Sequence, residues 1–144
     1  MGDTRRAMPQ RNVELLKQGF YDEWTRGEYP VRSDLWDPDG ELVFSDEFPD
    51  SSAARGMADR RKVLEDWLGA WRTWRMEVDE FVAEGDFVLL LNVVRGAGKG
   101  SGVEVETTGA HVWELRDGKV VGLTIYLDRD RARREMAGKV AERG

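Results

Sequence analysis

The alternation of apolar and polar residues predicts a β-hairpin in the last third of the chain. Two alternating runs, residues 109–115 and 120–128, are joined through Asp117-Gly118. An Asp-Gly pair between such runs is a strong hairpin signal, because both central residues of the tight turn must tolerate positive φ. A two-residue loop pairs Leu115 with Val120, and this register places His111 opposite Thr124.

Side chains alternate across a sheet, so the register decides which of them share a face. One face carries polar and aromatic side chains, namely His111, Trp113, Thr124, Tyr126 and Asp128. This mixture suits the wall of a pocket better than a plain core. The opposite face is aliphatic and includes Val112, Leu123 and Ile125. A bulge would shift the register by one residue and move the side chains of one strand to the other face.

Apolar residues at helical spacing predict two long helices before the hairpin. The first follows a predicted N-cap at Asn12 and spans residues 13–25, with Phe20 on its apolar side. The second spans residues 57–74 and has an apolar stripe. This stripe contains Val63, Trp67, Trp71 and Trp74.

The remaining segments predict short strands and turns. Residues 41–45 form a strand that a loop over residues 48–55 separates from the second helix. Further strands are predicted at 77–83 and 87–94, and the second is almost wholly apolar, so we expect it to be buried on both faces. The glycine-rich run at 96–102 lacks the Gly-Lys-Ser/Thr ending of a phosphate loop and precedes a strand, so we interpret it as a hairpin turn.

The order of these elements indicates an α+β protein with helices on one face of a curved sheet. A last helix is predicted at residues 130–137. We expect residues 1–11 to be disordered, a single domain over residues 12–138, and a frayed tail over residues 139–144.

Composition and charge narrow the classes of function. The 144 residues carry a formal net charge of -6, which argues against nucleic-acid binding. The absence of cysteine and the single histidine argue against disulfides, thiolate metal sites and histidine-rich metal sites. No apolar run has the length of a membrane span or the pattern of a signal peptide. We therefore expect a cytoplasmic protein with no metal, cofactor, nucleic-acid or membrane partner.

Short motifs along the chain carry a resemblance to a known family. They are Arg26-Gly27, Asp37-Pro38-Asp39, Arg55-Gly56, the hairpin of residues 115–120 and Tyr126-Leu127-Asp128. In this order they resemble the nuclear-transport-factor-2-like superfamily, and in particular its SnoaL-like branch, from Val13 to about Gly138. The resemblance implies a cone-shaped half-barrel: a curved antiparallel sheet with helices packed on the concave face around a deep pocket. The superfamily includes ketosteroid isomerase, polyketide cyclases, epoxide hydrolases and dehydratases, so the fold does not define a reaction.

The resemblance also suggests site residues. Asp46 lies near the position of the general base of ketosteroid isomerase, and His111 matches its oxyanion-hole acid. Phe20 matches the tyrosine that supplies the second oxyanion contact, but it has no hydroxyl, and Tyr21 lies about 100° further around the helix. Asp128 falls in the region of the acidic residue of SnoaL-type cyclases.

Each candidate also has a structural interpretation. Histidine suits proton transfer near neutral pH, but His111 is also consistent with a satisfied, semi-buried side chain. Asp46 is either a base or a loop carboxylate in water, and Asp128 is either a pocket carboxylate or the N-cap of the last helix. Tyr126 is expected in the pocket wall. Trp67 and Trp71 either line the pocket or fill the core.

Two functions follow from these observations. The first is a SnoaL-like protein that binds an apolar, ring-containing small molecule, with or without cofactor-free isomerase, cyclase or hydrolase activity. In an enzyme, His111 would be the acid or hydrogen-bond donor and Asp46 or Asp128 the base. The alternative is a non-catalytic binding or assembly module on the same cone. An open pocket with convergent polar groups would favour the first.

The aliphatic hairpin face predicts self-association. If the helices cover the pocket face, Val112, Leu123 and Ile125 remain in water and form a patch of the kind that marks an interface. A two-fold homodimer is the commonest way to bury such a patch. The resembled superfamily also dimerises through its sheet, so we expect a homodimer.

Overall fold

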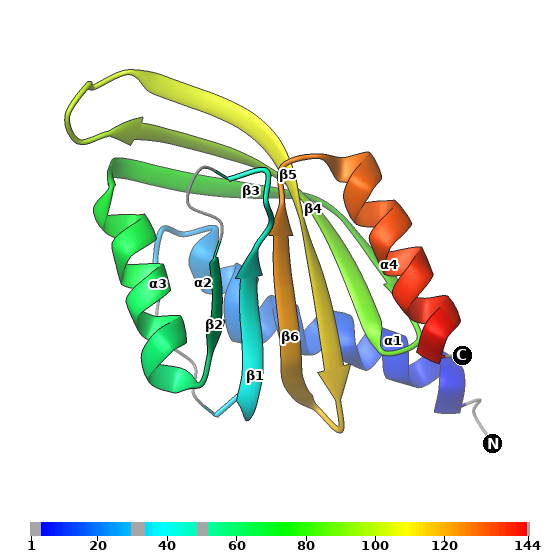
Figure 1. Ribbon diagram of the computed structural model, residues 1–144. Coiled ribbons are helices and arrows are strands. Elements are labelled where there is room, and N and C mark those ends of the chain that lie inside the picture. The colour runs from blue at the N-terminus through cyan, green and yellow to red at the C-terminus, as the bar shows by residue number, and fades with distance from the viewer. Residues whose placement is uncertain (1–3, 30–33, 49–51, 144) are drawn as a thin grey trace.

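A curved sheet flanked by helices forms the described part of the chain, residues 4–29, 34–48 and 52–143 of a computed structural model (Figure 1). Within these residues the sheet has six strands in the order β2-β1-β6-β5-β4-β3. The strands are β1 (Trp36–Phe44), β2 (Ser52–Arg55), β3 (Trp71–Glu84), β4 (Phe87–Gly98), β5 (Glu104–Arg116) and β6 (Lys119–Tyr126). Every neighbouring pair is antiparallel except β1 and β6, which run parallel. The expected α+β class is confirmed.

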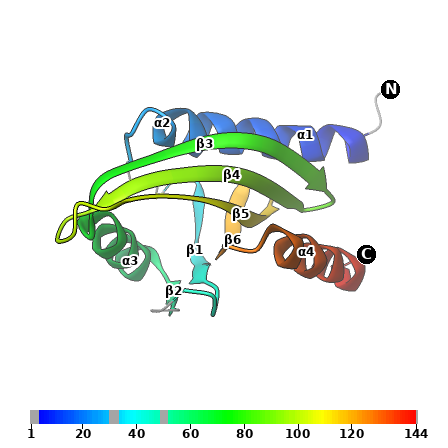
Figure 2. The same ribbon diagram turned by 90° about the horizontal axis from the view of Figure 1, so that it is seen from above.

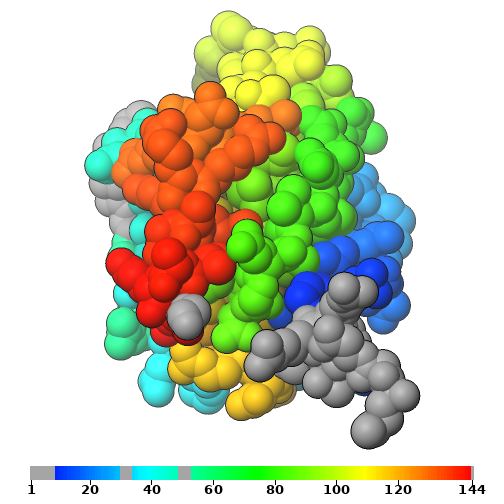
Figure 3. Space-filling model, turned by 90° about the vertical axis from the view of Figure 1, so that its right-hand side faces the viewer, coloured from blue at the N-terminus to red at the C-terminus, as the bar shows by residue number. Residues whose placement is uncertain are grey.

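Helices cover both faces of this sheet. The first helical segment runs from α1 (Thr4–Leu16) through a π-helical turn, η1 (Lys17–Tyr21), into α2 (Asp22–Trp24). It shares one hydrophobic cluster with α3 (Met57–Gly69), whereas α4 (Arg129–Arg143) packs into a second cluster on the other face. Figure 2 shows α1 and α4 on opposite sides of β3, β4 and β5, and Figure 3 shows α4 lying against the strands. No described helix is long and apolar enough to cross a membrane.

Strand β4 contributes to both clusters, as its apolar sequence predicts. Val88 and Leu90 face the cluster of α1 and α3, whereas Leu89 and Leu91 face α4. The predicted turn at 96–102 is shorter than expected, because Gly96, Ala97 and Gly98 belong to β4 and Ala97 pairs with Glu104. The rest of the glycine-rich run forms the turn into β5. This strand, which is buried on both faces, therefore connects the two helical layers.

Several boundaries differ from the predictions. The first helix already begins at Thr4, so the expected disorder over residues 1–11 is wrong from that residue onward, and Asn12 is a buried residue inside α1. Helix α4 continues to Arg143, beyond the predicted end at residue 137. The predicted loop at 48–55 contains strand β2, and residues 49–51 lie outside the described residues.

The second long helix ends five residues earlier than predicted. Helix α3 stops at Gly69, and Trp71 and Trp74 belong to β3. Aromatic and β-branched residues favour strands, and the segment Trp71-Arg72-Thr73-Trp74 is rich in them. A register shift between Trp71 and Thr73 compensates for the odd spacing, so that both indoles face the same cavity.

A bulge in β6 overturns the predicted face assignment. The two-residue loop and the pairing of Leu115 with Val120 are confirmed. However, Glu114 pairs with Gly122, so Val121 is an extra residue in β6. A one-residue shift moves side chains to the opposite face.

The shifted register separates the predicted pocket residues. His111 pairs with Ile125 instead of Thr124, and Ala110 pairs with Tyr126. His111 and Trp113 therefore share the face of Leu123 and Ile125, whereas Thr124 and Tyr126 start from the opposite face. The prediction that His111, Trp113, Thr124 and Tyr126 form one pocket wall is wrong.

The same shift and helix α4 also remove the predicted interface. Val112 is buried in the cluster that includes Ala132 and Met136 of α4. Leu123 and Ile125 lie on the other face and line the cavity described below. The three residues thus form no common exposed surface, and the homodimer interface predicted from them is wrong.

Candidate ligand pocket

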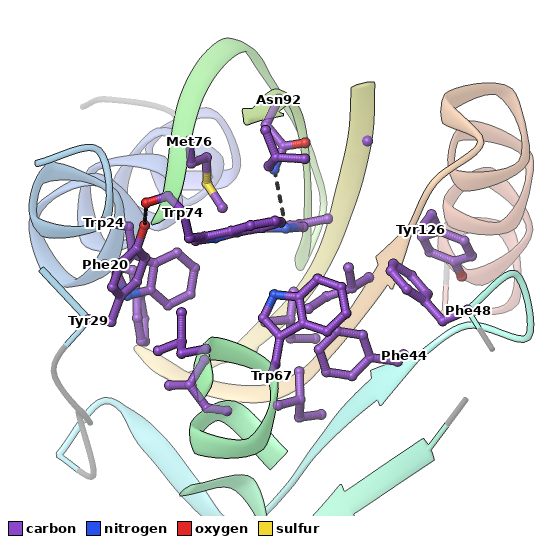
Figure 4. Close-up of a pocket in the computed structure, with 18 of the residues that line it drawn as sticks. Phe20, Trp24, Tyr29, Phe44, Phe48, Trp67, Trp74, Met76, Asn92 and Tyr126 are labelled. Atoms are coloured by element: carbon purple, nitrogen blue, oxygen red, sulfur yellow. Dashed lines mark hydrogen bonds between the residues drawn. The ribbon is translucent and has the colours of Figure 1, made fainter. Parts of the chain in front are cut away.

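A cavity of about 390 Å³ lies between the sheet and the helices η1, α2 and α3 (Figure 4). Its wall is mainly aromatic. Five of the six tryptophans line it, namely Trp24, Trp36, Trp67, Trp71 and Trp74. Phe20, Phe44 and Phe48 complete the aromatic lining. The tryptophans therefore surround an open space instead of filling it.

Two groups of contacting rings stiffen this wall. In the first, the ring centroid of Trp67 lies 5.4 Å from that of Phe44 and 5.4 Å from that of Trp74. In the second, Phe20 lies 4.9 Å from Trp113 and 5.4 Å from Trp24. Aromatic pairs at such separations attract each other beyond the gain from burial alone. The cavity is therefore preformed, with flat sides.

A chain of buried hydrogen bonds runs from behind the aromatic wall to the cavity. The Trp113 indole N–H donates to the Tyr21 hydroxyl over 2.6 Å. That hydroxyl lies 2.6 Å from Nδ1 of His111, and Nε2 of His111 lies 3.3 Å from the Asn92 amide. Figure 4 labels Asn92 and marks the hydrogen bond of its amide by a dashed line. All four side chains are buried, but only His111 and Asn92 line the cavity.

The π-helical turn η1 brings Tyr21 into this chain. Successive residues of an α-helix point about 100° apart, which would direct Phe20 and Tyr21 to different surroundings. The wider turn of η1 reduces that angle, and both side chains are buried against the sheet. Phe20 lines the cavity, and the Tyr21 hydroxyl reaches His111. Single π-helical turns often occur at functional sites.

Counting donors and acceptors assigns the protons in this chain of hydrogen bonds. The Tyr21 oxygen accepts from Trp113, so its own hydrogen is available to Nδ1 of His111. A neutral histidine then carries its proton on Nε2 and needs an acceptor there. The Asn92 Oδ1 atom has no partner among the described residues, and it becomes that acceptor when the amide oxygen and nitrogen exchange places. Every donor in this hydrogen-bond chain then points toward Asn92, and the Asn92 NH₂ group takes the buried position of Oδ1.

Burial keeps His111 neutral. Desolvation lowers the pKa of His111 to about 3 and raises the pKa of Tyr21 well above its ordinary value. His111 is therefore uncharged near neutral pH, and protein groups contact both of its ring nitrogens. This geometry gives His111 a role in orienting Asn92, while its predicted catalytic role remains a prediction.

The pKa of His111 makes stability depend on pH. In the unfolded chain histidine titrates near pH 6.5, so between pH 6.5 and 3 the unfolded state binds one more proton than the folded state. The free energy of unfolding should therefore fall by about 1.4 kcal/mol per pH unit as the pH decreases through this range. Urea denaturation should show that the wild type loses about 2 kcal/mol more than His111→Gln between pH 7 and pH 5. Equal losses in the two proteins would contradict this assignment.

Neither predicted carboxylate reaches the cavity. The side chain of Asp46 is 77% exposed and pairs with Arg131. Asp128 accepts backbone N–H bonds from Asp130 and Arg131 over 2.9 and 3.2 Å, which makes it the N-cap of α4. None of the described residues that line the cavity is Asp or Glu. The prediction of either residue as a pocket base is therefore wrong.

Some of the other residues predicted to contact a ligand line the cavity, and some do not. Phe20, Trp67 and Trp71 line the cavity. Tyr126 also reaches it, although its strand position is on the other face, and Figure 4 shows it beside Phe48 on the side away from Phe20. Trp113, Thr124 and Tyr21 are not part of the lining, although Trp113 and Tyr21 support it through the hydrogen-bond chain.

Asn92 and Arg60 are two of the lining residues that the sequence analysis missed. Asn92 is the one polar residue of the apolar run 87–94, and this isolated amide was the available signal. Arg60 lies on α3 and is only 7% exposed. Its guanidinium donates to the Gly40 carbonyl over 2.7 Å and lies 4.3 Å from the ring centroid of Trp36. No local pattern distinguishes Arg60 from its neighbour Arg61.

Solved structures share this architecture. An NTF2-like protein from Burkholderia thailandensis E264 has a TM-score of 0.72 at 21% identity, covering 87% of this chain and 96% of that chain. A proposed SnoaL-like polyketide cyclase from Jannaschia sp. CCS1 has a TM-score of 0.71 at 18% identity, covering 92% and 95%. TerC, co-crystallized with polyporic acid, has a TM-score of 0.68 at 19% identity, covering 85% and 95%. The fold is therefore NTF2-like.

The sequence gives the family within that fold. The SnoaL-like domain family matches residues 18–123, which is most of the chain. The chain therefore belongs to the SnoaL-like family, as the motifs predicted. No curated protein shows significant similarity to it.

Proposed function

We propose that this protein binds an apolar, ring-containing small molecule in the cavity. The observation that carries the proposal is the open cavity of about 390 Å³ with five tryptophans in its wall. This volume lies within the usual range of ligand pockets. TerC, which shares the fold, was crystallized with a small molecule, and this supports a binding role.

The chemistry of the lining favours flat, apolar ligands. Transfer of apolar surface from water contributes about 25 cal/mol per Å², and rigid aromatic walls lose little freedom when a ring enters. A site built in this way binds by shape and by the burial of apolar surface.

The arrangement supports binding more than proton transfer or assembly. The described lining lacks a carboxylate, and His111 is neutral and already contacted at both nitrogens. An assembly module has no need for an open aromatic cavity, and here the cavity is not filled by side chains. We therefore infer a ligand-binding protein, and any reaction would depend on groups of the ligand itself.

Ligand-induced thermal stabilisation tests this proposal. Steroids, terpenoids and the neutral probe 4-biphenylcarboxamide should be compared with decanamide, a flexible amide without rings. A ligand at one hundred times its Kd stabilises the folded state by about 2.7 kcal/mol, which should raise the Tm by roughly 5–10 °C. We expect such a shift for at least one ring compound and a smaller one for decanamide. If no ring compound raises the Tm up to its solubility limit, the assembly alternative is favoured.

A further inference from the structure

The wall of the cavity carries positive charge that no carboxylate of the described lining compensates. The charged residues in that lining are Arg60 and Arg61. The whole chain has 28 acidic and 22 basic residues, so its net charge is negative. The charged residues of the described lining are both basic, so the charge of the cavity wall is opposite in sign to that of the protein. The cavity therefore differs electrostatically from the rest of the molecule.

Arg60 is the important member of this pair because it is buried. Its known contacts are the Gly40 carbonyl and the face of Trp36, and neither carries a negative charge. Within the described part of the chain, Arg60 forms no ion pair, whereas the exposed Arg26, Arg55 and Arg95 each do. Desolvation lowers the pKa of Arg60, and the more distant Asp37 only partly opposes this effect.

A buried cation without a partner is costly, and the cost disappears when an anion binds beside it. The guanidinium group has five N–H donors in a planar fork that matches a carboxylate or another pair of oxygens. One of its nitrogens is directed to Gly40, which leaves other donors available. The surrounding low dielectric strengthens the attraction for an anion that enters the cavity.

We infer that the ligand is an organic anion: an apolar ring system with a carboxylate or an ionised enol or phenol that Arg60 binds. This inference rests on the proposed function, because it places the anion and the rings in the same cavity. Trp36 positions the guanidinium by its ring face, and the tryptophans around Trp67 hold the apolar part.

Paired probes with the same rings separate charge from shape. 4-Biphenylcarboxylate and 4-biphenylcarboxamide should be titrated at pH 7.5, with quenching of tryptophan fluorescence as the signal. We expect the carboxylate to bind wild type at least about tenfold more tightly than the amide, which corresponds to about 1.4 kcal/mol. Arg60→Met should reduce the carboxylate affinity to that of the amide and change the amide affinity by less than about threefold. Arg116→Met is the matched control, because Arg116 is exposed and outside the cavity lining.

The outcomes distinguish this inference from the proposed function. If the wild type bound the carboxylate and the amide with equal affinity, the inference that the ligand is an anion would be overturned, and the proposal that the cavity binds rings would stand. A carboxylate preference that survives in Arg60→Met would also overturn the role of Arg60. If neither probe binds, both the inference and the proposed function fail. If Arg60→Met does not fold, Arg60→Gln replaces it, because glutamine can still donate to Gly40 but carries no charge.

Discussion

The Tyr21→Phe variant is expected to be less stable than the wild type by about 2–4 kcal/mol. The substitution removes a single oxygen, yet that oxygen accepts from Trp113 and donates to His111 inside the core. Both partners stay buried and lose a hydrogen bond, and each such loss typically costs about 1–3 kcal/mol. Urea denaturation at pH 7 measures the difference directly.

Tyr29→Phe is the matched control for this prediction. The Tyr29 hydroxyl donates to the Trp74 carbonyl over 3.0 Å, but it is only partly buried and has a single partner. We expect its removal to cost about 1 kcal/mol. If Tyr21→Phe cost no more than Tyr29→Phe, the hydrogen-bond chain would not be a stabilising feature of the core.

The Ile125→Trp variant is expected to lose ligand affinity by about 10–100-fold, or about 1.4–2.8 kcal/mol. Ile125 is half-buried and lines the cavity, so an indole at this position occupies space that a ligand ring needs. The folded protein should tolerate the change, because the added ring enters a space that is already open. Calorimetric titration with 4-biphenylcarboxamide measures the affinity, and urea denaturation checks the fold.

Val82→Trp provides the comparison for Ile125→Trp. Val82 is an exposed position of β3 outside the cavity lining, so its substitution should leave the affinity unchanged. An Ile125→Trp protein that is folded and binds as tightly as the wild type would place the ligand elsewhere.

The fold was predictable from the sequence to the extent that local signals determine it. Asp117-Gly118 determined the hairpin turn because few residue pairs tolerate its geometry, and the apolar run 87–94 identified the strand that is buried on both faces. The bulge at Val121 was not predictable, since its neighbours Val120 and Gly122 fit a regular strand equally well. That single residue decided which side chains of β6 face the cavity.

The candidate site was only partly predictable because long-range pairing assembles it. His111 lines the cavity, but its partner Asn92 comes from β4 and its support Tyr21 from η1. Asp128 shows the opposite problem. Its carboxylate matched a family position, yet it serves as the N-cap of the adjoining helix α4. The sequence had already indicated this N-cap as the alternative to a pocket carboxylate.

The indole N–H signals in a two-dimensional nitrogen–proton NMR spectrum test the central claim most directly. The six tryptophans give six such signals, which single Trp→Phe variants would assign. Saturation with 4-biphenylcarboxamide should shift the signals of the five tryptophans that line the cavity, while Trp113, whose N–H is bound to Tyr21 outside the lining, should shift least. Binding that leaves these five signals in place would contradict the assignment of the cavity as the ligand site.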